Sequence, residues 1–528
     1  MLLKKYPERT EFLGLAKMFN VVPLCAEILA DVETPVSILQ KFQESGNEKG
    51  PLFLLESVEG GEHWGRYSFL GVRAYEEVKI YRDYVEILSK KREGEDEERW
   101  IQRVNHGGDP LAVLRKYMSR FKAVSFTELP RFFGGLVGYF AYEMVSFIEN
   151  VPNYLPPEVP VAHLMLPEQM VIFDNLRQSM TCVQLVFFEE TSGLQNTQDV
   201  IHAFKNGNEK LQELVKRVQK CEGDHTEGKK LSRKKVRDLE LRPKYSENEY
   251  RKKVNEAKTH IMAGDVIQVV VAQPFLCDAP EDTVALYRAQ RYVNPSPYLY
   301  YVLLDGRCMI GSSPETMVKL ERGTAWVRPI AGTRPRGKMP KEDRQMADEL
   351  LKSEKERAEH LMLVDLGRND LGRVAAPGSV RVTDLMFVER YSHVMHLVSN
   401  VTCELSAECD VWDLFKAVFP AGTLSGAPKV PAMKIIAELE KESRGFYGGA
   451  VGYVSFTGDM DLAITIRTAC VEKEKLFVYA GAGIVADSVP AEEYRETINK
   501  AKSVEMALNF VEKWEAEKDS YEEDKNLN

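Results

Sequence analysis

Two pairs of glutamates carry the strongest chemical signal in this sequence, Glu356 with Glu359 and Glu493 with Glu496. Each pair is spaced i, i+3 in a segment with the pattern of a helix, where residues three apart share one face. Each pair can therefore direct its carboxylate oxygens at one point. A divided carboxylate site of this kind suits Mg²⁺, which binds through a few carboxylates together with water and an anionic substrate.

Simpler interpretations of the first pair stay open. Ser353 and Glu356 fit a capping box, with Ser353 as the N-cap and Glu356 at the N3 position, and this would explain Glu356 without any metal. Glu359 lies one turn further into the helix, where a capping role is excluded. A solvated helix face would account for Glu359.

The second pair has its own simpler interpretation. Glu493, Glu496 and Lys500 fall within about 60° of one another around a helix of 100° per residue. The same segment carries an apolar stripe of Tyr494, Ile498, Ala501, Leu508 and Val511. By itself this pattern predicts only an amphipathic helix.

Four motifs surround the glutamate pairs: residues 329–334, residues 360–366 with Arg368, Asn369 and Asp370, residues 419–429, and residues 480–483. Together they resemble the chorismate-utilising enzymes, in particular the anthranilate synthase component I family. The resemblance runs in order over about residues 246–510 and more loosely over the N-terminal half. It implies an α/β (α+β) sandwich of two interleaved subdomains.

The order of local signals agrees with large mixed or antiparallel sheets flanked by helices. A capping box at Ser246 and Glu249 opens a helix that runs through Ile261 and ends at Gly264, and a buried strand follows over residues 267–272. Further strands are expected over residues 298–304, 325–330, 380–385 and 476–480. These strands do not alternate regularly with helices, which disfavours a doubly wound fold.

We expect four regions along the chain. Residues 1–200 would form an N-terminal regulatory and partner-binding region, and residues 201–245 a polar linker, because residues 221–230 are charged and contain glycine. Residues 246–510 would form the chorismate-binding catalytic domain, and residues 511–528 an acidic tail.

The two halves share one short pattern, because residues 134–139 and 448–453 both contain Gly-Gly, a glycine three residues further on, and then tyrosine. Two explanations remain open: an old duplication of a sheet element, or a recurrent strand entry at which glycine permits close approach.

Composition excludes several classes of function. The chain has 528 residues, of which 44% are hydrophobic, so it can bury one large core or two to three ordinary ones. A net charge of -10 disfavours nucleic acid and anionic membranes as partners. The eight cysteines include no CxxC pair, which disfavours zinc and disulfides. No apolar run is long enough for a membrane span and no signal core is present, so we expect a cytoplasmic protein.

Several residues match the family's substrate-binding positions. The loop of Gly481, Ala482 and Gly483 lacks a dinucleotide fingerprint, and the resemblance implies that its backbone amides bind a substrate carboxylate. The other expected chorismate-binding residues are Gly332, Thr333, Tyr447, Arg467 and Lys500. Arg467 lies in an apolar segment that we interpret as a strand, where a charge is costly unless an anion pairs with it.

Three residues are expected to act in catalysis: His396, Thr423 and Gln268. A histidine in an apolar strand is more often a core residue, but His396 matches the family's active-site histidine, whereas His393 and His360 are weaker candidates. Water-using relatives carry a lysine base where this chain has Gln268, and aminodeoxychorismate synthases carry a lysine nucleophile where it has Ala331. Amination of chorismate to anthranilate is the activity that these two positions favour.

The resemblance also implies Mg²⁺ as the cofactor, bound by Glu356, Glu359, Glu493 and Glu496, and a reaction that opens tryptophan biosynthesis. A glutamine amidotransferase, component II, would supply ammonia, because no cysteine here lies in a Gly-x-Cys-x-Gly setting. Aminodeoxychorismate synthase and a non-catalytic amino-acid-sensing subunit are the alternatives.

Residues 54–57 and 294–298 resemble the two walls of the family's tryptophan feedback site. The expected contacts are Glu56 for the amino group, Ser57 for a hydrogen bond, a wall of Pro297, Tyr298 and Leu299 over the indole ring, and Arg66 for the carboxylate. A strand end and a proline turn would look the same without a ligand.

Overall fold

The structure is a computed structural model, and it describes residues 2–44, 50–57, 65–89, 100–188, 197–220, 239–390 and 394–526. For residues 44 and 515–526 it describes the backbone alone. None of the helices in these ranges combines the length and the apolar character that crossing a membrane requires.

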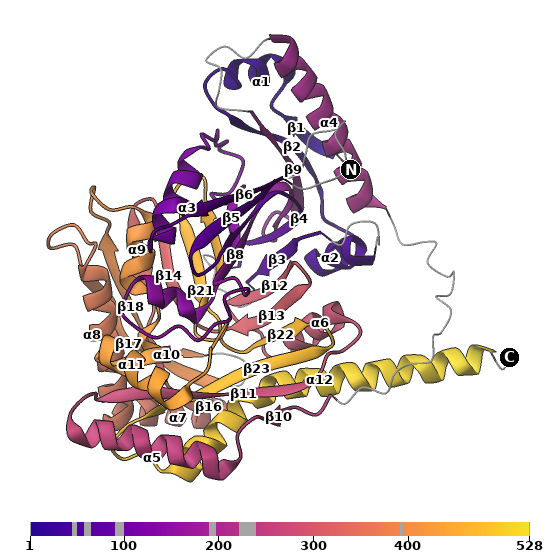
Figure 1. Cartoon of the computed structure of the whole chain (residues 1–528). Coiled ribbons are helices and arrows are strands. Elements are labelled where there is room, and N and C mark those ends of the chain that lie inside the picture. The colour runs from indigo at the N-terminus through magenta and orange to yellow at the C-terminus, as the bar shows by residue number, and fades with distance from the viewer. Residues whose placement is uncertain are drawn as a thin grey trace.

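The N-terminal half is a set of long strands with helices on its outer side (Figure 1). In chain order its elements are β1 (Leu2–Tyr6), α1 (Arg9–Leu15), β2 (Val21–Leu29), α2 (Pro35–Glu44), β3 (Leu52–Glu56), β4 (Tyr67–Ile80), β5 (Tyr84–Ser89), β6 (Trp100–Asn105), α3 (Pro110–Ser119), β7 (Gly135–Phe140), η1 (Tyr142–Phe147), β8 (Ala162–Asp174), β9 (Ser179–Phe187) and α4 (Thr197–Gln219).

The C-terminal half begins after residue 238 and ends in a long helix. Its elements are β10 (Arg242–Pro243), α5 (Glu247–Ala263), β11 (Gln268–Asp278), α6 (Thr283–Val293), β12 (Tyr298–Leu304), β13 (Arg307–Ser313), β14 (Thr316–Glu321), β15 (Thr324–Val327), β16 (Ile330–Pro335), α7 (Pro340–Lys352), α8 (Glu354–Gly372), β17 (Arg381–Arg390), β18 (Val394–Glu404), α9 (Val411–Val418), α10 (Gly422–Ser425), β19 (Gly426–Ala427), α11 (Lys429–Glu440), β20 (Ala450–Ser455), β21 (Met460–Ile464), β22 (Thr468–Glu472), β23 (Lys475–Ile484) and α12 (Pro490–Asn526).

The two halves interleave through their strands. β3 of the N-terminal half pairs antiparallel with β12, and β7 pairs antiparallel with β20. The second pairing joins the two segments that share the glycine pattern, with Gly138 opposite Gly452. A side chain at Gly452 would meet the carbonyl oxygen of Asp461 at 2.1 Å, so close approach of neighbouring strands requires glycine there.

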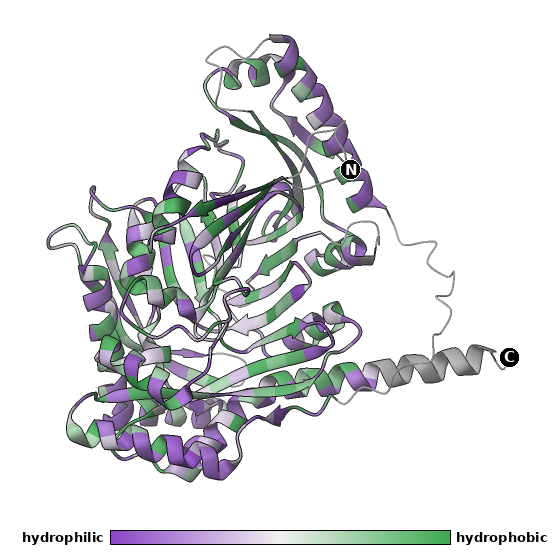
Figure 2. Ribbon diagram, viewed as in Figure 1, coloured by the Kyte–Doolittle hydropathy of each residue, from purple (hydrophilic) through white to green (hydrophobic). Residues whose placement is uncertain are grey.

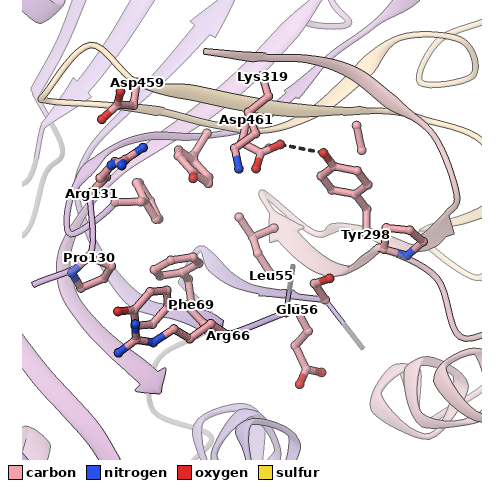
Figure 3. Close-up of a pocket in the computed structure, with 18 of the residues that line it drawn as sticks. Leu55, Glu56, Arg66, Phe69, Pro130, Arg131, Tyr298, Lys319, Asp459 and Asp461 are labelled. Atoms are coloured by element: carbon pink, nitrogen blue, oxygen red, sulfur yellow. Dashed lines mark hydrogen bonds between the residues drawn. The ribbon is translucent and has the colours of Figure 1, made fainter. Parts of the chain in front are cut away.

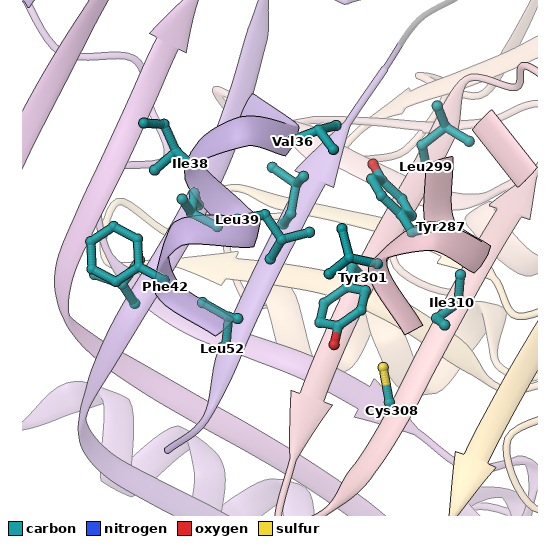
Figure 4. Packing of buried hydrophobic residues seen from close by; sticks show 14 of the residues in the cluster. Val36, Ile38, Leu39, Phe42, Leu52, Tyr287, Leu299, Tyr301, Cys308 and Ile310 are labelled. Atoms are coloured by element: carbon teal, nitrogen blue, oxygen red, sulfur yellow. The ribbon is translucent and has the colours of Figure 1, made fainter. Parts of the chain in front are cut away.

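One extensive hydrophobic core lies where the halves meet. Figure 4 shows Leu39 of α2 on the side of Tyr301 of β12, whereas Phe42 projects from the opposite side of α2, and all three belong to the same core. Figure 2 shows that hydrophobic residues follow the interior strands, whereas the outer helices α4 and α5 carry many hydrophilic residues. Each sheet therefore buries apolar faces against helices or against the other half.

Most of the expected local elements are confirmed. Ser246 accepts a hydrogen bond from the amide of Glu249 in a complete capping box, and Gly264 ends α5 in a left-handed conformation with φ of 85°. The strand expected over residues 298–304 is β12, and those over 267–272, 380–385 and 476–480 lie within or overlap β11, β17 and β23. The strand expected over 325–330 is split between β15 and β16.

Two region boundaries are wrong. Residues 201–219, expected in a polar linker, belong to α4, whose Leu211 and Leu214 are buried against β2 and β9. This amphipathic helix was missed because its wide polar face dominates the composition. The rest of that linker, up to residue 238, lies outside the described residues. The acidic tail is also no separate segment, because Val511 is buried and the backbone of α12 continues to Asn526.

Candidate active site

A cavity of about 540 Å³ lies among β11, β16, α8, β23 and the first turns of α12. Its lining contains Gln268, Gly332, Thr333, Glu356, Glu359, His396, Thr423, Tyr447, Arg467, Gly481, Gly483, Glu493, Glu496 and Lys500. The structure therefore brings together the residues expected to bind chorismate and metal, with one exception. Ala482 is fully buried in the apolar cluster behind β23, because alternate residues of a strand point to opposite faces.

The first glutamate pair projects from the start of α8. The hydroxyl of Ser353 accepts a hydrogen bond from the amide of Glu356, so Ser353 is the N-cap. The Glu356 carboxylate instead faces the cavity and accepts a hydrogen bond from Arg334 at 3.1 Å. A side chain at Gly332, whose φ is 69°, would meet this carboxylate at 2.9 Å. Glycine is thus needed where β16 passes the start of α8.

The second pair enters from α12. Glu496 forms an ion pair of 2.6 Å with Lys500, one helical turn further on. The Lys500 ammonium also donates to the carbonyl of Gly481 at 2.8 Å, which ties α12 to β23. Glu493 is half-buried, and burial raises its pKa.

The four carboxylates repel one another across the cavity. Burial raises the pKa of Glu359, and the charges of Glu356 and Glu496 raise it further. A cation between the two helices would relieve this repulsion, so the donor set fits Mg²⁺. Among the described residues, no three acidic, cysteine or histidine side chains are grouped closely enough to hold a metal ion alone. Substrate and solvent oxygens would have to complete the coordination.

His396 lies on β18 opposite Thr333 of β16. Its Nδ1 atom lies 3.1 Å from the carbonyl oxygen of Gly332 and 3.1 Å from the Thr333 hydroxyl. Nδ1 donates to that carbonyl, which leaves Nε2 as the acceptor of the neutral ring. Burial lowers the pKa of His396, so the ring is neutral near pH 7. His360 is a core residue, because it is fully buried with its Nε2 atom 2.6 Å from the Ser399 hydroxyl. His393 lies outside the described residues.

Arg467 corrects one expectation about local structure. It lies in the connection between β21 and β22 with φ of 51°, not within a strand. Its guanidinium donates to the carbonyl of Lys500 at 2.8 Å, which directs it at the third turn of α12. Burial lowers the pKa of Arg467, which reflects a charge held in a poorly solvated place. An anionic substrate would supply the missing counter-charge.

The glycines of β23 let neighbouring side chains approach the backbone. A side chain at Gly481 would meet the hydroxyl of Tyr447 at 2.7 Å. A side chain at Gly483 would meet the side-chain amide nitrogen, Nε2, of Gln268 at 2.8 Å. These two positions therefore keep the floor of the cavity open to Tyr447 and Gln268.

Glu315 is a site residue that sequence reasoning missed. It lies between β13 and β14, lines the cavity and is buried. Burial raises the pKa of Glu315 to about 7, although the neighbouring Thr423 hydroxyl and the charge of Lys500 oppose the shift. A carboxyl group with such a pKa can carry a proton at neutral pH. The sequence feature that could have indicated Glu315 is an acidic residue directly after Pro314, at the end of a strand.

A buried ionic network lies behind the cavity. The Arg444 guanidinium donates twice to Glu440, at 2.8 and 2.6 Å, and also to the carbonyls of Leu424 and Val270. Glu143 of the N-terminal half accepts from the Arg444 amide at 2.8 Å. Val270 and Leu424 both line the cavity. Arg444 therefore holds two walls of the site in place from behind, and its charge is balanced by hydrogen-bonded carboxylate.

A second cavity, of about 530 Å³, lies between β3, β12 and β21 (Figure 3). Its lining includes Leu55, Glu56, Ser57, Arg66, Pro297, Tyr298 and Leu299. The Tyr298 hydroxyl donates to Asp461 at 2.8 Å, and the buried Ser57 hydroxyl has no hydrogen-bond partner among the described residues. The residues expected to surround a tryptophan therefore meet at one cavity.

Two expected contacts in this cavity are engaged elsewhere. Figure 3 shows the Glu56 carboxylate directed away from the other labelled side chains. It accepts a hydrogen bond from Tyr287 at 2.6 Å, so it is not free for an amino group in this structure. Arg66 forms an ion pair of 2.7 Å with Asp174. Residues 58–64, which include part of the unmatched third wall, lie outside the described residues.

The comparisons with known proteins agree with this geometry. Residues 74–506 match the family described as chorismate binding enzyme. The chain belongs to this family. It is 44% identical over 505 residues to anthranilate synthase component 1 of Aquifex aeolicus (strain VF5), covering 95% of this chain and 98% of that protein. It is also 44% identical over 513 residues to anthranilate synthase component 1 of Pseudomonas putida, covering 96% and 99%.

Two solved structures share the fold. The crystal structure of anthranilate synthase component I from Streptococcus pneumoniae TIGR4 is 34% identical, with a TM-score of 0.67 over 90% of this chain and 99% of that one. The menaquinone-specific isochorismate synthase of Escherichia coli is 19% identical, with a TM-score of 0.64 over 94% and 99%. The expected sandwich of antiparallel sheets and helices is thereby confirmed.

Proposed function

We propose that this chain is the chorismate-converting component of an anthranilate synthase, which catalyses the first step of tryptophan biosynthesis. It forms anthranilate and pyruvate from chorismate and ammonia. The observation that carries the proposal is that one cavity is lined by the two glutamate pairs, the half-buried guanidinium of Arg467 and the Glu315 carboxyl group, whose pKa is raised. Near full-length identity to anthranilate synthase component 1 of two organisms supports it.

Chorismate is a dianion in a protein with net charge -10, so the cavity must supply local positive charge. Arg467 and Tyr447 are placed to hold one acidic arm of the substrate, because Arg467 is half-buried and forms no ion pair with a carboxylate among the described residues. The backbone of Gly481 and Gly483 offers amides beside Lys500 for a second carboxylate. Bound Mg²⁺, held by Glu356, Glu359, Glu493 and Glu496 with the substrate, would stabilise negative charge on the ring carboxylate.

The first chemical stage replaces the C4 hydroxyl by an amino group at C2. Glu315 is suited to donate a proton to the departing hydroxyl, since its pKa of about 7 leaves it substantially protonated. The Thr423 hydroxyl borders the same cavity and has no hydrogen-bond partner among the described residues, so it is available to contact the substrate. Gln268 borders the cavity with a neutral amide, which cannot deprotonate water, whereas ammonia needs no such base.

The second stage removes the C2 proton and releases pyruvate. Neutral His396 is suited to accept that proton at Nε2, because Nδ1 donates to the Gly332 carbonyl. Ala331 borders the same cavity and has no nucleophilic atom, which disfavours the covalent route to aminodeoxychorismate.

The product tests this assignment directly. Purified chain, given chorismate, Mg²⁺ and an ammonium salt, is expected to release fluorescent anthranilate together with an equal amount of pyruvate. Omitting the ammonium salt, or replacing it with glutamine, should abolish product formation. Appearance of isochorismate or an aminodeoxychorismate in place of anthranilate would contradict the proposal.

We also propose that a component II amidotransferase supplies the ammonia from glutamine. The component number in the relatives' names supports this, as does the absence of a glutaminase cysteine motif from the sequence. A cytoplasmic location fits the described cysteines, all of which are free thiols.

The second cavity is proposed as the tryptophan feedback site. Its volume suits an amino acid. The buried Ser57 hydroxyl has no hydrogen-bond partner among the described residues, and Tyr298 lines the same cavity, so a bound ligand could accept or donate a hydrogen bond there. Changing Ser57 to Arg should fill this cavity and raise the tryptophan concentration for half-inhibition at least about tenfold, a loss of about 1.4 kcal/mol in binding. The uninhibited kcat should stay within about twofold, because the variant leaves the active-site lining intact. Unchanged inhibition would remove Ser57 from the site.

A further inference from the structure

A small cavity of about 50 Å³ adjoins the active site on the side of Glu315. It shares three lining residues with the active-site cavity: Glu315, Leu363 and Thr423. Its remaining walls come from β14, the segment around Arg328, the second half of α8 and the loop before α10. Glu315 and Thr423 thus form a partition with space on both sides.

The small cavity, called the rear cavity below, is large enough only for water. A volume of about 50 Å³ holds one or a few water molecules, because a single water needs only about 10–15 Å³ on the same kind of measure. Chorismate cannot enter. Arg328, Leu366, Ala421 and Gly422 are only partly buried, so this end of the cavity lies nearer the protein surface than Glu315 does.

In the proposed function, on which this step rests, each turnover consumes the proton of Glu315 and releases one water molecule beside it. When the C4–oxygen bond breaks, its electron pair leaves with the oxygen, and the proton from Glu315 converts the departing hydroxide into water. Glu315 is then a buried carboxylate that must regain a proton. The new C2 ammonium group loses one proton to solvent, so the protons balance over the cycle.

We propose that the rear cavity is a water compartment through which Glu315 regains its proton and the water from C4 leaves, while the substrate fills the front cavity. Water there can contact the Glu315–Thr423 partition without crossing the substrate. The compartment is lined by polar groups as well as apolar ones, which water requires.

Charged groups approach Glu315 from both the front cavity and the rear cavity. Burial raises the pKa of Glu315, whereas the Thr423 hydroxyl and the charge of Lys500, which both line the front cavity, lower it. On the rear side, Arg328 pairs with Glu389 at 2.7 Å, and Asp370 pairs with Lys429 at 2.6 Å. These rear charges are therefore mutually compensated. Water is the remaining source of solvation for the Glu315 carboxylate, and removing it should raise the pKa.

Leu366 offers a matched pair of variants, because it lines the rear cavity and not the front one. Leu366→Phe should fill the compartment, whereas Leu366→Ala should enlarge it. For Leu366→Phe we expect kcat to fall at least about fivefold. This is less than the about 10²- to 10⁴-fold fall expected for loss of the general acid itself, because Glu315 remains in place. The KM values for chorismate and ammonium should stay within about twofold. The fall in kcat at alkaline pH should move to higher pH by about half a unit or more.

Leu366→Ala should keep both the kcat and the pH profile of the unmodified chain. Thermal melting shows whether each variant folds, and Ala421→Val provides a second way to fill the compartment if Leu366→Phe does not. An unchanged kcat and pH profile in a folded, filled variant would overturn the proposal. A raised KM for ammonium with unchanged kcat would also overturn it, because the cavity would then carry ammonia.

Failure of the proposed function would look different. In that case the unmodified chain would form no anthranilate, or Glu315→Gln would keep full activity. Neither result depends on the volume at Leu366. The filled variants therefore test the water compartment separately from the assignment of Glu315.

Discussion

Replacing Glu359 with Gln is expected to lower kcat/KM for chorismate about 10³-fold, which corresponds to about 4 kcal/mol of transition-state stabilisation. The amide keeps the size of the side chain but removes a charge from a cavity in which Glu356 and Glu496 face it. Glu496→Gln should have a similar effect from the opposite helix. Both variants should also need a higher Mg²⁺ concentration for half-maximal rate. Steady-state kinetics over a Mg²⁺ titration measures both quantities.

A matched control lies on the same helix. Glu354 is in the first turn of α8, is exposed and does not line the cavity. Glu354→Gln should therefore keep kcat/KM within about twofold. Equal activity of Glu359→Gln and Glu354→Gln would refute a shared carboxylate site on α8 and α12.

Changing Glu315 to Gln is expected to lower kcat about 10²- to 10⁴-fold, the range for loss of a general acid. The protonated form of Glu315 is the active one, so kcat of the unmodified chain should fall as pH rises through about 7. The variant has no group to titrate there, and its residual kcat should lack this fall. A pH series at saturating chorismate and ammonium compares the two profiles.

The KM for chorismate provides the internal check on Glu315. A proton donor to the departing hydroxyl acts in the transition state, so Glu315→Gln should leave KM within a few-fold. A large rise in KM with little change in kcat would identify Glu315 as a binding residue instead.

Local sequence signals predicted local structure well. The capping box at Ser246, the left-handed stop at Gly264 and the strand that became β12 depend on a few adjacent residues, and each is confirmed. The helix α4 shows where composition misleads, because its few buried residues are spaced among many charged ones. The pairing of β7 with β20 joins residues more than three hundred positions apart, and no local pattern encodes a partner at that distance.

The sequence predicted which residues line the candidate site, but not how their side chains are oriented. Motif positions placed all but Ala482 of the expected active-site residues on one cavity. Orientation depends on tertiary contacts: the Glu56 carboxylate points to Tyr287, and the Arg66 guanidinium pairs with Asp174. Glu315 was missed because its distinction is a burial-dependent pKa, and burial arises only when β13, β14 and the Thr423 turn come together.

The pairing of β7 with β20 also bears on how the polypeptide can be divided. Separate expression of residues 1–220 would leave one edge of β7 without its hydrogen-bonding neighbour, and expression of residues 239–528 would do the same to β20. Unsatisfied strand edges of this kind recruit other chains and promote aggregation. Soluble material should therefore be recovered only when both fragments are co-expressed, as a non-covalent pair rather than as autonomous modules.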